Sequence, residues 1–333
     1  IAYSSVVRGR NTRYVLPDLL SKPEQATRLN GLDKKSPLSD QKREPEIRVP
    51  VWDQPMSINK TGNWRVVTPS FGDRPPPCSH NCPAGTDVRL FVIHVSEGKL
   101  REAFDTIYQS NPFPAVCGRV CPHFCQQNCN RLALDEELNI AGMERYLGDH
   151  LDDLEIRPAQ VQHRERIAII GSGPAGLTAA LRLRQKGYPV TVFESHAKPG
   201  GMMRIGIPEF RLPEEVLDRE IDRIVLSGVE IRTGRKVTVP ELEKDFDAVI
   251  VATGSPLGAP MYVPNEELAM DGLNFLDDYK MHGEKSGIKP GDRVMVIGGG
   301  NTAIDVARTA RRLGAEATIY YRRSKKEMPA IHT

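Results

Sequence analysis

The chain lacks any apolar run near the roughly 20 residues that a membrane-spanning helix needs, and its N-terminus lacks the apolar core of a signal peptide. It also lacks an excess of either charge, because 45 Lys and Arg residues face 43 Asp and Glu residues, for a net charge of +2. Such a balance gives no general attraction to nucleic acid or to an anionic membrane. We also find no Ser–His–Asp triad, paired-carboxylate site or covalent nucleophile to propose. We therefore expect a cytoplasmic protein with neither a membrane span nor a nucleic-acid partner.

The length of 333 residues predicts roughly two domains with ample material for a core. Residues 1–75 are rich in Pro, Lys, Arg and Asp and show little apolar periodicity, so we expect an extended N-terminal arm. Residues 76–160 repeat apolar residues at intervals of three and four, as amphipathic helices do. After that, short β-branched runs alternate with helical segments, which indicates a parallel sheet of βαβ units. The predicted fold class is α/β, with an N-terminal α-helical domain (76–160) followed by two Rossmann-like dinucleotide-binding domains (161–270 and, incomplete, 271–333).

The first dinucleotide fingerprint lies in "IAIIGSGPAG", where a predicted strand runs into Gly171-x-Gly173-x-x-Gly176 and then into a helix. In that order the glycines would allow a tight turn, close approach of the backbone to a pyrophosphate, and close packing of helix on strand. The pyrophosphate would lie on the helix N-terminus, whose free N–H groups and dipole favour anions. Glu194 ends the next predicted strand and is placed to accept a hydrogen bond from a ribose hydroxyl. Strand, helix and acid together favour dinucleotide binding over a purely structural turn.

The second fingerprint is Gly298-x-Gly300-x-x-Ala303, again between a predicted strand and a helix. The position that corresponds to Glu194 holds a tyrosine, and Arg322 and Arg323 follow it. An acid there would repel a 2′-phosphate, whereas arginines would bind it with charge-assisted hydrogen bonds. We therefore expect NADP(H) rather than NAD(H) at this site. The alternative is that both arginines are merely solvated.

Two such sites, the first with an acid and the second with arginines, suggest a flavoprotein that passes hydride from NADPH to FAD. Between them, "KPGGMMRIGIPEFRLP" (198–213) contains glycines that would let the backbone pass close to a flat ring, although an ordinary Pro/Gly loop has the same composition. The segment "VIVATGS" (249–255) resembles the strand and turn that close the FAD site of two-dinucleotide flavoproteins. The further candidate cofactor-binding residues are Pro174, Ala175, Gly201, Met202, Arg204, Ile207, Arg211, Val237, Ala252, Thr253, Gly254, Asn301, Thr302 and Asp305.

All six cysteines lie between Cys78 and Cys129, in "CSHNC" and "CGRVCPHFCQQNC". Thiols stay reduced in the cytoplasm, which argues against disulfides. Zinc sites commonly pair cysteines with two residues between them, and that spacing is absent. Iron–sulfur clusters take four thiolates each and often have a Cys-Pro step, which occurs at Cys82 and Cys121. We favour iron–sulfur ligation over zinc or free core thiols, although six cysteines fall short of two all-cysteine clusters.

The sequence resembles the glutamate synthase small-subunit family in "CSHNCPAGTD", "NPFPAVCGRVCPHFC", "GSGPAG", "GIPEFRLP", "GGGNTAIDVAR" and "YYRRSKKEMPA". That family includes the N-terminal half of dihydropyrimidine dehydrogenase, the large subunit of NADH-dependent ferredoxin:NADP oxidoreductase, and a sulfite-reductase-associated NAD(P)H oxidoreductase. The likeness runs from about Thr61 to the end. It implies an enzyme that passes electrons from NAD(P)H through FAD and one or two [4Fe–4S] clusters to a partner protein. The partner would be of the glutamate synthase large-subunit, ferredoxin or sulfite reductase type. The rival prediction is a non-catalytic electron-relay or scaffold subunit of a larger redox complex.

The resemblance also implies the ligands of the cluster nearer the flavin. They would be Cys82, Cys121 and Cys125, with Glu144 as a non-cysteine fourth ligand. The bare sequence instead places Glu144 on a solvated helix face.

The other cluster would take Cys78 and Cys129. The family pattern has two more cysteines just upstream, where this chain has "FGDRPPP". Cys117, or an oxygen or nitrogen ligand for which His80 and His123 are candidates, would have to complete that cluster. The family's FAD domain is also completed by a C-terminal return segment that is missing here. We therefore expect the chain to be part of a longer polypeptide.

Overall fold

The structure is a computed structural model that describes residues 5–8, 75–150, 158–255, 258, 264–282 and 287–331. Most of the arm predicted for residues 1–75 lies outside these ranges. Within the described ranges, no helix combines the length and the apolar character that crossing a bilayer requires.

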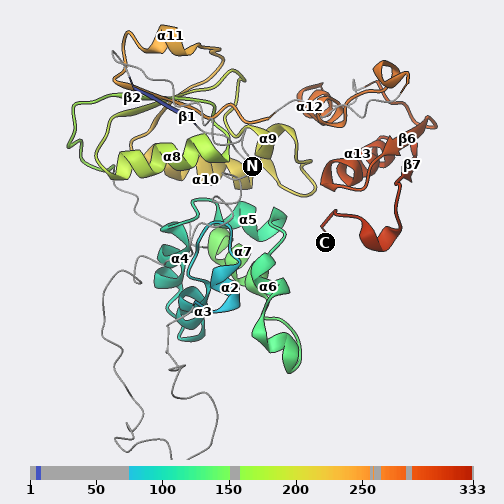
Figure 1. Ribbon diagram of the computed structural model, residues 1–333, viewed down its shortest axis with the longest axis horizontal. Helices are drawn as coiled ribbons and strands as arrows, with labels where there is room; N and C mark the ends of the chain where they lie inside the picture. Colours follow the sequence, from blue (N-terminus) through green and yellow to red (C-terminus); the bar gives the residue numbers. More distant parts are fainter. Residues whose placement is uncertain are drawn as a thin grey trace, which may run out of the picture. The chain divides into compact units, whose positions relative to one another are not determined.

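Residues 77–150 form a helical region (Figure 1). Its elements are α2 (Pro77–His80), α3 (Val88–Ser96), α4 (Leu100–Tyr108), α5 (Pro114–Val120), α6 (Phe124–Gln127), the 3-10 helix η2 (Asn130–Ala133) and α7 (Ile140–His150). Helix α3 begins after Asp87, whose carboxylate accepts a hydrogen bond from the Leu90 N–H at 3.1 Å and so caps the helix. The core of this region joins buried apolar side chains of α3, α4 and α7 with that of Cys125 on α6.

The larger sheet has the strand order β1-β5-β2-β3-β4. Its strands are β1 (Ser5–Arg8), β2 (Ile167–Ile170), β3 (Val190–Phe193), β4 (Glu230–Arg232) and β5 (Ala248–Val251). Strands β2 to β5 are parallel, with Ile167 paired to Val190 on one side and to Ala248 on the other, whereas β1 is antiparallel to β5 at the edge. The helices between these strands are α8 (Pro174–Gln185), α9 (Met202–Ile205), α10 (Glu214–Leu226) and α11 (Val239–Leu242). Strands β2 and β3 are apolar on both faces because cores cover both sides.

A second, two-stranded parallel sheet repeats the pattern. It consists of β6 (Arg293–Ile297) and β7 (Glu316–Tyr320), with α12 (Gly272–His282) and α13 (Asn301–Arg312) packed on it and the short 3-10 helices η3 (Glu266–Leu268) and η5 (Lys325–Glu327) nearby in sequence. The helical region followed by two strand–fingerprint–helix–strand units confirms the predicted fold class.

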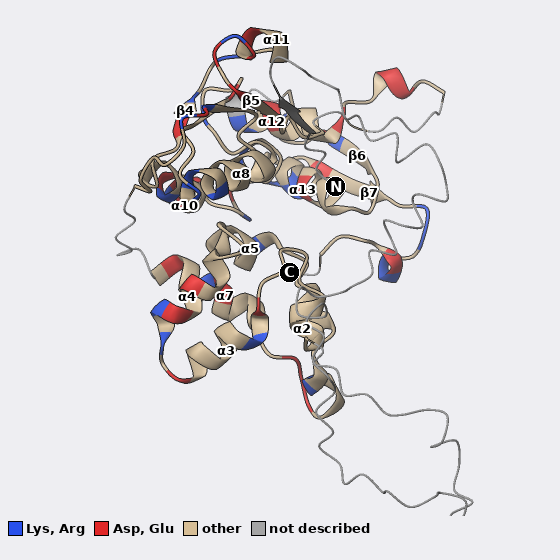
Figure 2. Cartoon of the chain, turned by 60° about the vertical axis from the view of Figure 1, so that its left-hand side comes forward, with Lys and Arg blue, Asp and Glu red and all other residues tan. Residues whose placement is uncertain are grey.

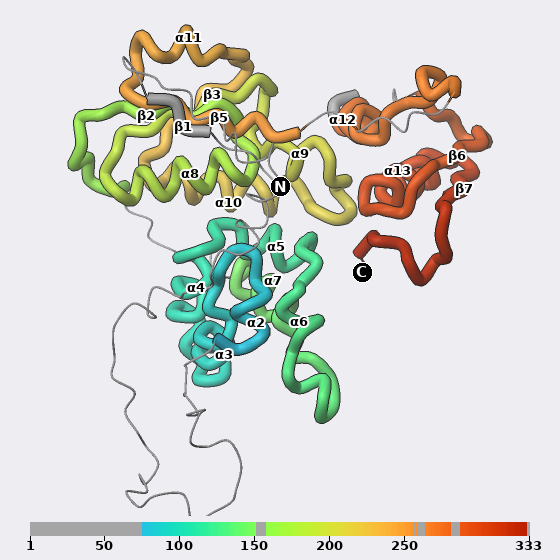
Figure 3. Tube along the Cα trace, viewed as in Figure 1, coloured from blue at the N-terminus to red at the C-terminus, as the bar shows by residue number. Residues whose placement is uncertain are grey.

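Helices α5 and α7 cross in backbone contact (Figure 3). A Cβ added at Gly118 would lie 2.6 Å from Cα of Arg145, and one added at Gly148 would lie 2.4 Å from the backbone nitrogen of Ala115. A larger residue at either position would push the two helices apart. The first turn of α5 also belongs to the core of the larger sheet, so the helical region and the first dinucleotide-binding region share this helix.

Candidate cofactor and cluster sites

In the first fingerprint, two glycines are required by close backbone contacts, whereas the third has open space beside it. Gly171 ends β2 with φ +104°, and an added Cβ would lie 2.4 Å from the Ala252 carbonyl oxygen. A Cβ at Gly176, in the first turn of α8, would lie 2.0 Å from the Gly171 carbonyl oxygen. At Gly173, the N-cap of α8, φ is −70° and ψ is −179°, and no other heavy atom lies within 4 Å of an added Cβ. Open space at a helix N-terminus fits a pyrophosphate. The neighbouring candidates lie in the first turn of α8 (Pro174, Ala175) and directly after β5 (Ala252, Thr253, Gly254).

Glu194 directly follows β3, and its side chain is buried. One carboxylate oxygen accepts hydrogen bonds from the N–H of Ser172, at 3.1 Å, and from the Ser172 hydroxyl. The other accepts from the His196 N–H at 2.9 Å and lies 3.0 Å from His196 Nδ1. Burial acts to raise the pKa of Glu194, but the donors of His196 and Ser172 outweigh it and lower the pKa to about 2. The carboxylate is therefore ionised and held in a fixed direction at the end of the strand.

The loop 198–213 packs onto this fingerprint through its glycines. A Cβ at Gly201, the N-cap of α9 with φ +51°, would lie 2.7 Å from Cα of Gly173. Arg204 is buried, donates from Nε to the Pro199 carbonyl oxygen at 2.5 Å, and forms an ion pair with Asp218. These contacts fix Arg204 between the start of the loop and helix α10. The other candidates here are apolar, namely Met202 on α9 and the core-packed Ile207 and Val237.

Two of the predicted cofactor-binding residues contact each other. Arg211, which precedes α10, donates from Nη1 to Oδ2 of Asp305 on α13 at 2.6 Å, and both side chains are largely buried. Burial raises the pKa of Asp305, whereas Arg211 acts to lower it. Beside this pair, the Phe210 ring packs against Arg308 and Arg312, whose Cζ atoms lie 4.6 and 3.8 Å from the ring centroid. The pair thus joins the loop 198–213 to the helix of the second fingerprint.

The second fingerprint has the same geometry as the first. Gly298 follows β6 with φ +134°, and Gly300 is the N-cap of α13 with φ −85°, ψ 175° and no other heavy atom within 4 Å of an added Cβ. Ala303 replaces the third glycine, and its Cβ would lie 3.2 Å from a Cβ at Gly298. Asn301 and Thr302 occupy the first turn of α13. A second open helix N-terminus therefore fits a second dinucleotide.

The residues after β7 lie next to this fingerprint. Tyr321, which stands where the first fingerprint has its acid, packs against Gly299, because a Cβ added there would lie 2.7 Å from the tyrosine ring. Arg322 and Arg323 follow directly and are exposed. The described geometry leaves both guanidinium groups accessible to a phosphate.

Cys82, Cys121, Cys125 and Glu144 lie close enough together to affect one another's pKa values. Burial, helped by nearby Cys82, Glu144 and Cys121 and opposed by the Gln126 N–H, raises the pKa of Cys125 to about 12. Burial also raises the pKa of Cys121; the His123 N–H opposes this rise, while Glu144 and Cys82 add to it. Four donors from three separate segments fit the four-ligand shell of a [4Fe–4S] cluster.

Glu144 does not lie on a solvated face, because its side chain is only 12% exposed. Its Oε1 accepts a hydrogen bond from Asn111 Nδ2 at 2.9 Å, and its Oε2 lies 3.5 Å from His123 Nε2. Asn111 Oδ1 in turn accepts from the Phe113 N–H at 3.0 Å and from the Cys117 thiol at 3.7 Å. Sequence reasoning missed Asn111 as a site residue. The N-cap preference of Asn does not identify it, because the N-cap of α5 is Phe113, and its contact with Glu144 spans 33 residues of sequence.

The remaining cysteines lie on short elements around this group. Cys78 on α2 packs with Cys82 against the core that contains Cys125, and Cys129 is the N-cap of η2. Burial raises the pKa of the Cys117 thiol well above its usual value. Among the described residues, no three His, Cys, Asp or Glu side chains converge as ligands of one metal ion would. A cubane is ligated at its separate corners, so its ligands need not converge on one point.

Two open dinucleotide fingerprints that follow a cysteine-rich helical region are the features of the class of proteins that bind a flavin, a nicotinamide nucleotide and iron–sulfur clusters. The chain belongs to the pyridine nucleotide-disulphide oxidoreductase family, whose model matches residues 165–331. The model for dihydropyrimidine dehydrogenase domain II with its 4Fe-4S cluster matches residues 73–156. The chain accordingly combines a pyridine nucleotide-disulphide oxidoreductase domain with a 4Fe–4S domain, which supports the predicted FAD, NAD(P)H and 4Fe–4S cofactors. The resemblance seen in the sequence is confirmed.

The chain is similar to subunits of several named oxidoreductases. It is 40% identical over 272 residues to the NADPH-Fe(3+) oxidoreductase subunit beta of Geobacter sulfurreducens, covering 76% of this chain and 40% of that protein. It is 37% identical over 290 residues to the NADP(+)-dependent formate dehydrogenase subunit beta of Moorella thermoacetica, covering 77% and 41%. It is 38% identical over 266 residues to the NAD-dependent dihydropyrimidine dehydrogenase subunit PreT of Escherichia coli, covering 76% and 63%. The chain thus spans between 40% and 63% of the length of these relatives.

Proposed function

We propose that the protein oxidises NADPH and passes the electrons through FAD and [4Fe–4S] clusters to a separate redox protein. The observation that carries this proposal is the placement of α5. This helix carries Cys117 and is capped at its C-terminal end by Cys121, while its first turn packs in the core under the FAD fingerprint. Helix α5 therefore connects the proposed cluster ligand Cys121, at its C-terminal end, to the core under the proposed flavin site.

The chain's own residues bind and orient the cofactors in this proposal. The N-terminus of α8 at Gly173 binds the FAD pyrophosphate, and Glu194 accepts from its ribose. The N-terminus of α13 at Gly300 binds the second pyrophosphate, and Arg322 and Arg323 bind the 2′-phosphate that distinguishes NADPH from NADH.

Cys82, Cys121, Cys125 and Glu144 hold the cluster nearer the flavin. A flavin held at the first fingerprint would supply the chemistry that connects a two-electron nicotinamide donor to one-electron clusters. Asn111 keeps Glu144 directed at the cysteines and excludes alternative orientations of its carboxylate. The domain limits 76–160, 161–270 and 271–333 and a cytoplasmic location belong to the same proposal.

The test is an anaerobic visible spectrum of the full-length protein during titration with NADPH and, separately, NADH. We expect NADPH to bleach the flavin band and then the broad absorbance of the clusters. Clusters that no nicotinamide nucleotide reduces would favour the relay or scaffold role instead. Reduction of an added ferredoxin, compared with that of a sulfite reductase or a glutamate synthase large subunit, would identify the type of partner.

A further inference from the structure

Helix α5 begins without a capping side chain of its own. Its N-cap residue is Phe113, and the helix is seven residues long, so its unpaired N–H groups need acceptors from elsewhere. The Phe113 N–H donates to Asn111, and Pro114 at the first helical position has no N–H. The two that remain, on Ala115 and Val116, both donate to one carboxylate, that of Glu220 on α10.

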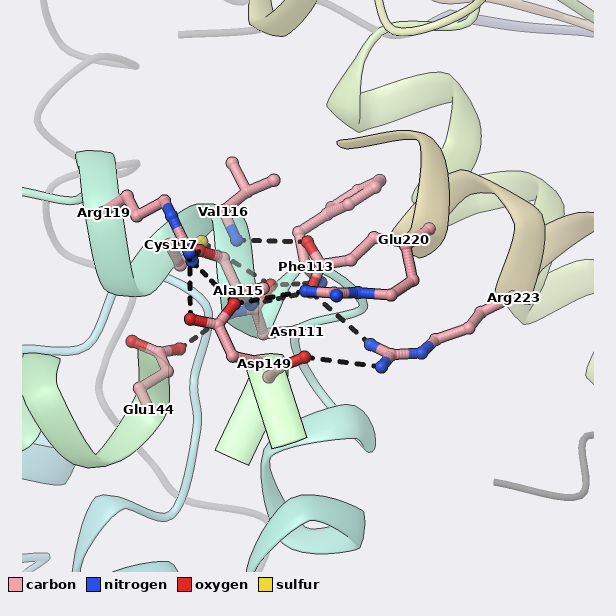
Figure 4. A network of polar contacts seen from close by, with 12 residues as sticks. Asn111, Phe113, Ala115, Val116, Cys117, Arg119, Glu144, Asp149, Glu220 and Arg223 are labelled. Carbon is pink, nitrogen blue, oxygen red and sulfur yellow. Dashed lines mark hydrogen bonds and ion pairs between the residues drawn. The ribbon is translucent and has the colours of Figure 1, made fainter. Parts of the chain in front are cut away.

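Figure 4 shows this carboxylate lying across the start of α5. Glu220 Oε1 accepts from the Ala115 N–H at 2.6 Å, and Oε2 accepts from the Val116 N–H at 3.1 Å. The Glu220 side chain is fully buried, and Nη1 of Arg223 lies 3.8 Å from Oε1. Burial raises the pKa of Glu220 to about 8, while the two N–H groups and Arg223 act to lower it. A buried carboxyl is costly unless its hydrogen bonds are made, so the contact specifies one docking geometry.

A second contact between the same elements lies further along α5. Asp149 on α7 accepts from both terminal nitrogens of Arg119 on α5, each at 2.9 Å, and from Nη2 of Arg219 on α10 at 3.2 Å. Burial alone would raise the pKa of Asp149, but Arg119, Arg219 and Arg145 lower it below its usual range. The α10 helix of the FAD-binding region thus contacts α5 directly through Glu220 and indirectly through Asp149.

From these contacts we propose that Glu220 is a positioning residue: from the FAD-binding region it holds the start of α5, and so fixes Cys117 and Cys121 relative to the flavin site. This inference rests on the proposed function for its consequence, because Cys121 is a proposed ligand of the cluster nearer the flavin. Among the described residues, the hydrogen bonds and the ion pair of Glu220 go to Ala115, Val116 and Arg223, and not to either fingerprint. Its substitution should therefore alter the cluster while leaving FAD binding intact.

The experiment compares Glu220→Gln with Glu215→Gln in the full-length protein. Glu215 is exposed on the same helix and has the same chemical change, so it is the matched control (Figure 2 shows both charge signs along α10). In Glu220→Gln, the side-chain NH₂ replaces one of the two acceptor oxygens. It is itself a donor, so either the Ala115 or the Val116 N–H is left without its acceptor. Hydrogen exchange of the peptide with Ala115 and Val116 should become at least about tenfold faster, because one of these two buried N–H groups loses its acceptor. The midpoint potential and the electron paramagnetic resonance spectrum of the reduced cluster should shift, with unchanged FAD content.

Other outcomes decide against the inference. The inference would be overturned if hydrogen exchange at Ala115 and Val116 were unchanged in Glu220→Gln. It would also be overturned if Glu215→Gln shifted the cluster spectrum in the same way. If Glu220→Gln yields no folded protein, Glu220→Asp is tested instead. Asp keeps both carboxyl oxygens but is one methylene shorter, so the same changes in hydrogen exchange and in the cluster spectrum are expected. Failure of both to fold while Glu215→Gln folds would also overturn it, by making Glu220 a requirement of the whole fold. A parent protein without a reducible cluster would contradict the proposed function. The hydrogen-exchange result would still test, independently, whether Glu220 holds the start of α5.

Discussion

Substitution of the fingerprint glycines should separate FAD binding from folding. Gly173→Ala places a methyl group in space that the protein leaves empty, at backbone angles open to any residue. Gly176→Ala makes the same chemical change only three residues later. There the new Cβ would lie 2.0 Å from the Gly171 carbonyl oxygen, a backbone atom that cannot move without displacing the β2–α8 turn.

The two variants should change the free energy of unfolding in opposite directions. Removing a glycine restricts the unfolded chain, so Gly173→Ala should stabilise the FAD-free protein by roughly 0.4–1 kcal/mol. Gly176→Ala gains the same entropy but must relieve an overpacked contact, which costs about 1–3 kcal/mol or more. For FAD, the methyl of Gly173→Ala occupies the space where the pyrophosphate must meet the backbone. We therefore expect Gly173→Ala to lose bound FAD.

The assay measures FAD per chain after purification and thermal unfolding of FAD-free protein. Stability must be compared without FAD, because loss of a bound ligand itself lowers the unfolding temperature. Our placement of the fingerprint is wrong if Gly173→Ala purifies with stoichiometric FAD. Equal destabilisation by Gly173→Ala and Gly176→Ala would refute the division of roles between the two glycines.

Four further predictions follow from the same geometry. Gly300→Ala should abolish reduction by NADPH while FAD content stays at the parent level, which absorbance titration checks. Replacement of Arg322 and Arg323 by Ala should raise the Michaelis constant for NADPH more than for NADH, since each lost charge-assisted contact costs on the order of 1.5–3 kcal/mol; equal changes for both nucleotides would contradict it. Glu144→Cys should retain iron but shift the cluster's midpoint potential, because a carboxylate is a harder donor than a thiolate, and an unshifted potential would count against Glu144 as a ligand. Glu194, whose pKa falls from 4.5 to about 2 on folding, should contribute at most about 3 kcal/mol above pH 4.5 and lose this as the pH falls toward 2. The difference in unfolding free energy between parent and Glu194→Gln should therefore shrink over that window, as denaturant titrations at several pH values would show.

Local rules were enough to predict both fingerprints. The spacing of Gly171, Gly173 and Gly176 reports local requirements of the turn: the structure shows a positive φ at Gly171, close backbone contacts at Gly171 and Gly176, and open space at Gly173. The strands β2 and β3 around the first fingerprint were equally readable, because buried parallel strands are nearly continuous apolar runs. The fold class followed from these two local patterns.

The surroundings of the site could not be predicted in this way. Arg211 and Asp305 each lie in a fingerprint-like segment, but their ion pair depends on how two distant segments pack. Glu220 lies in "LDREIDRIVL", a pattern typical of a helix with a charged outer face, yet its side chain is fully buried. Only the tertiary contact with α5 distinguishes it from the exposed acids around it. The same holds for Glu144, which is largely buried and accepts a hydrogen bond from Asn111, 33 residues away in the sequence.

Helix α5 shows why such contacts matter for the proposed cluster. Seven residues are too few for an independently stable helix, so its geometry is imposed by what surrounds it. Glu220 satisfies its first N–H groups, Asn111 satisfies the one before them, and Gly118 and Gly148 let α7 approach its backbone. These contacts come from both the FAD-binding region and the helical region. The arrangement of Cys121 beside Glu144 can therefore exist only when both regions are folded against each other, which links assembly of the cluster site to formation of the flavin site.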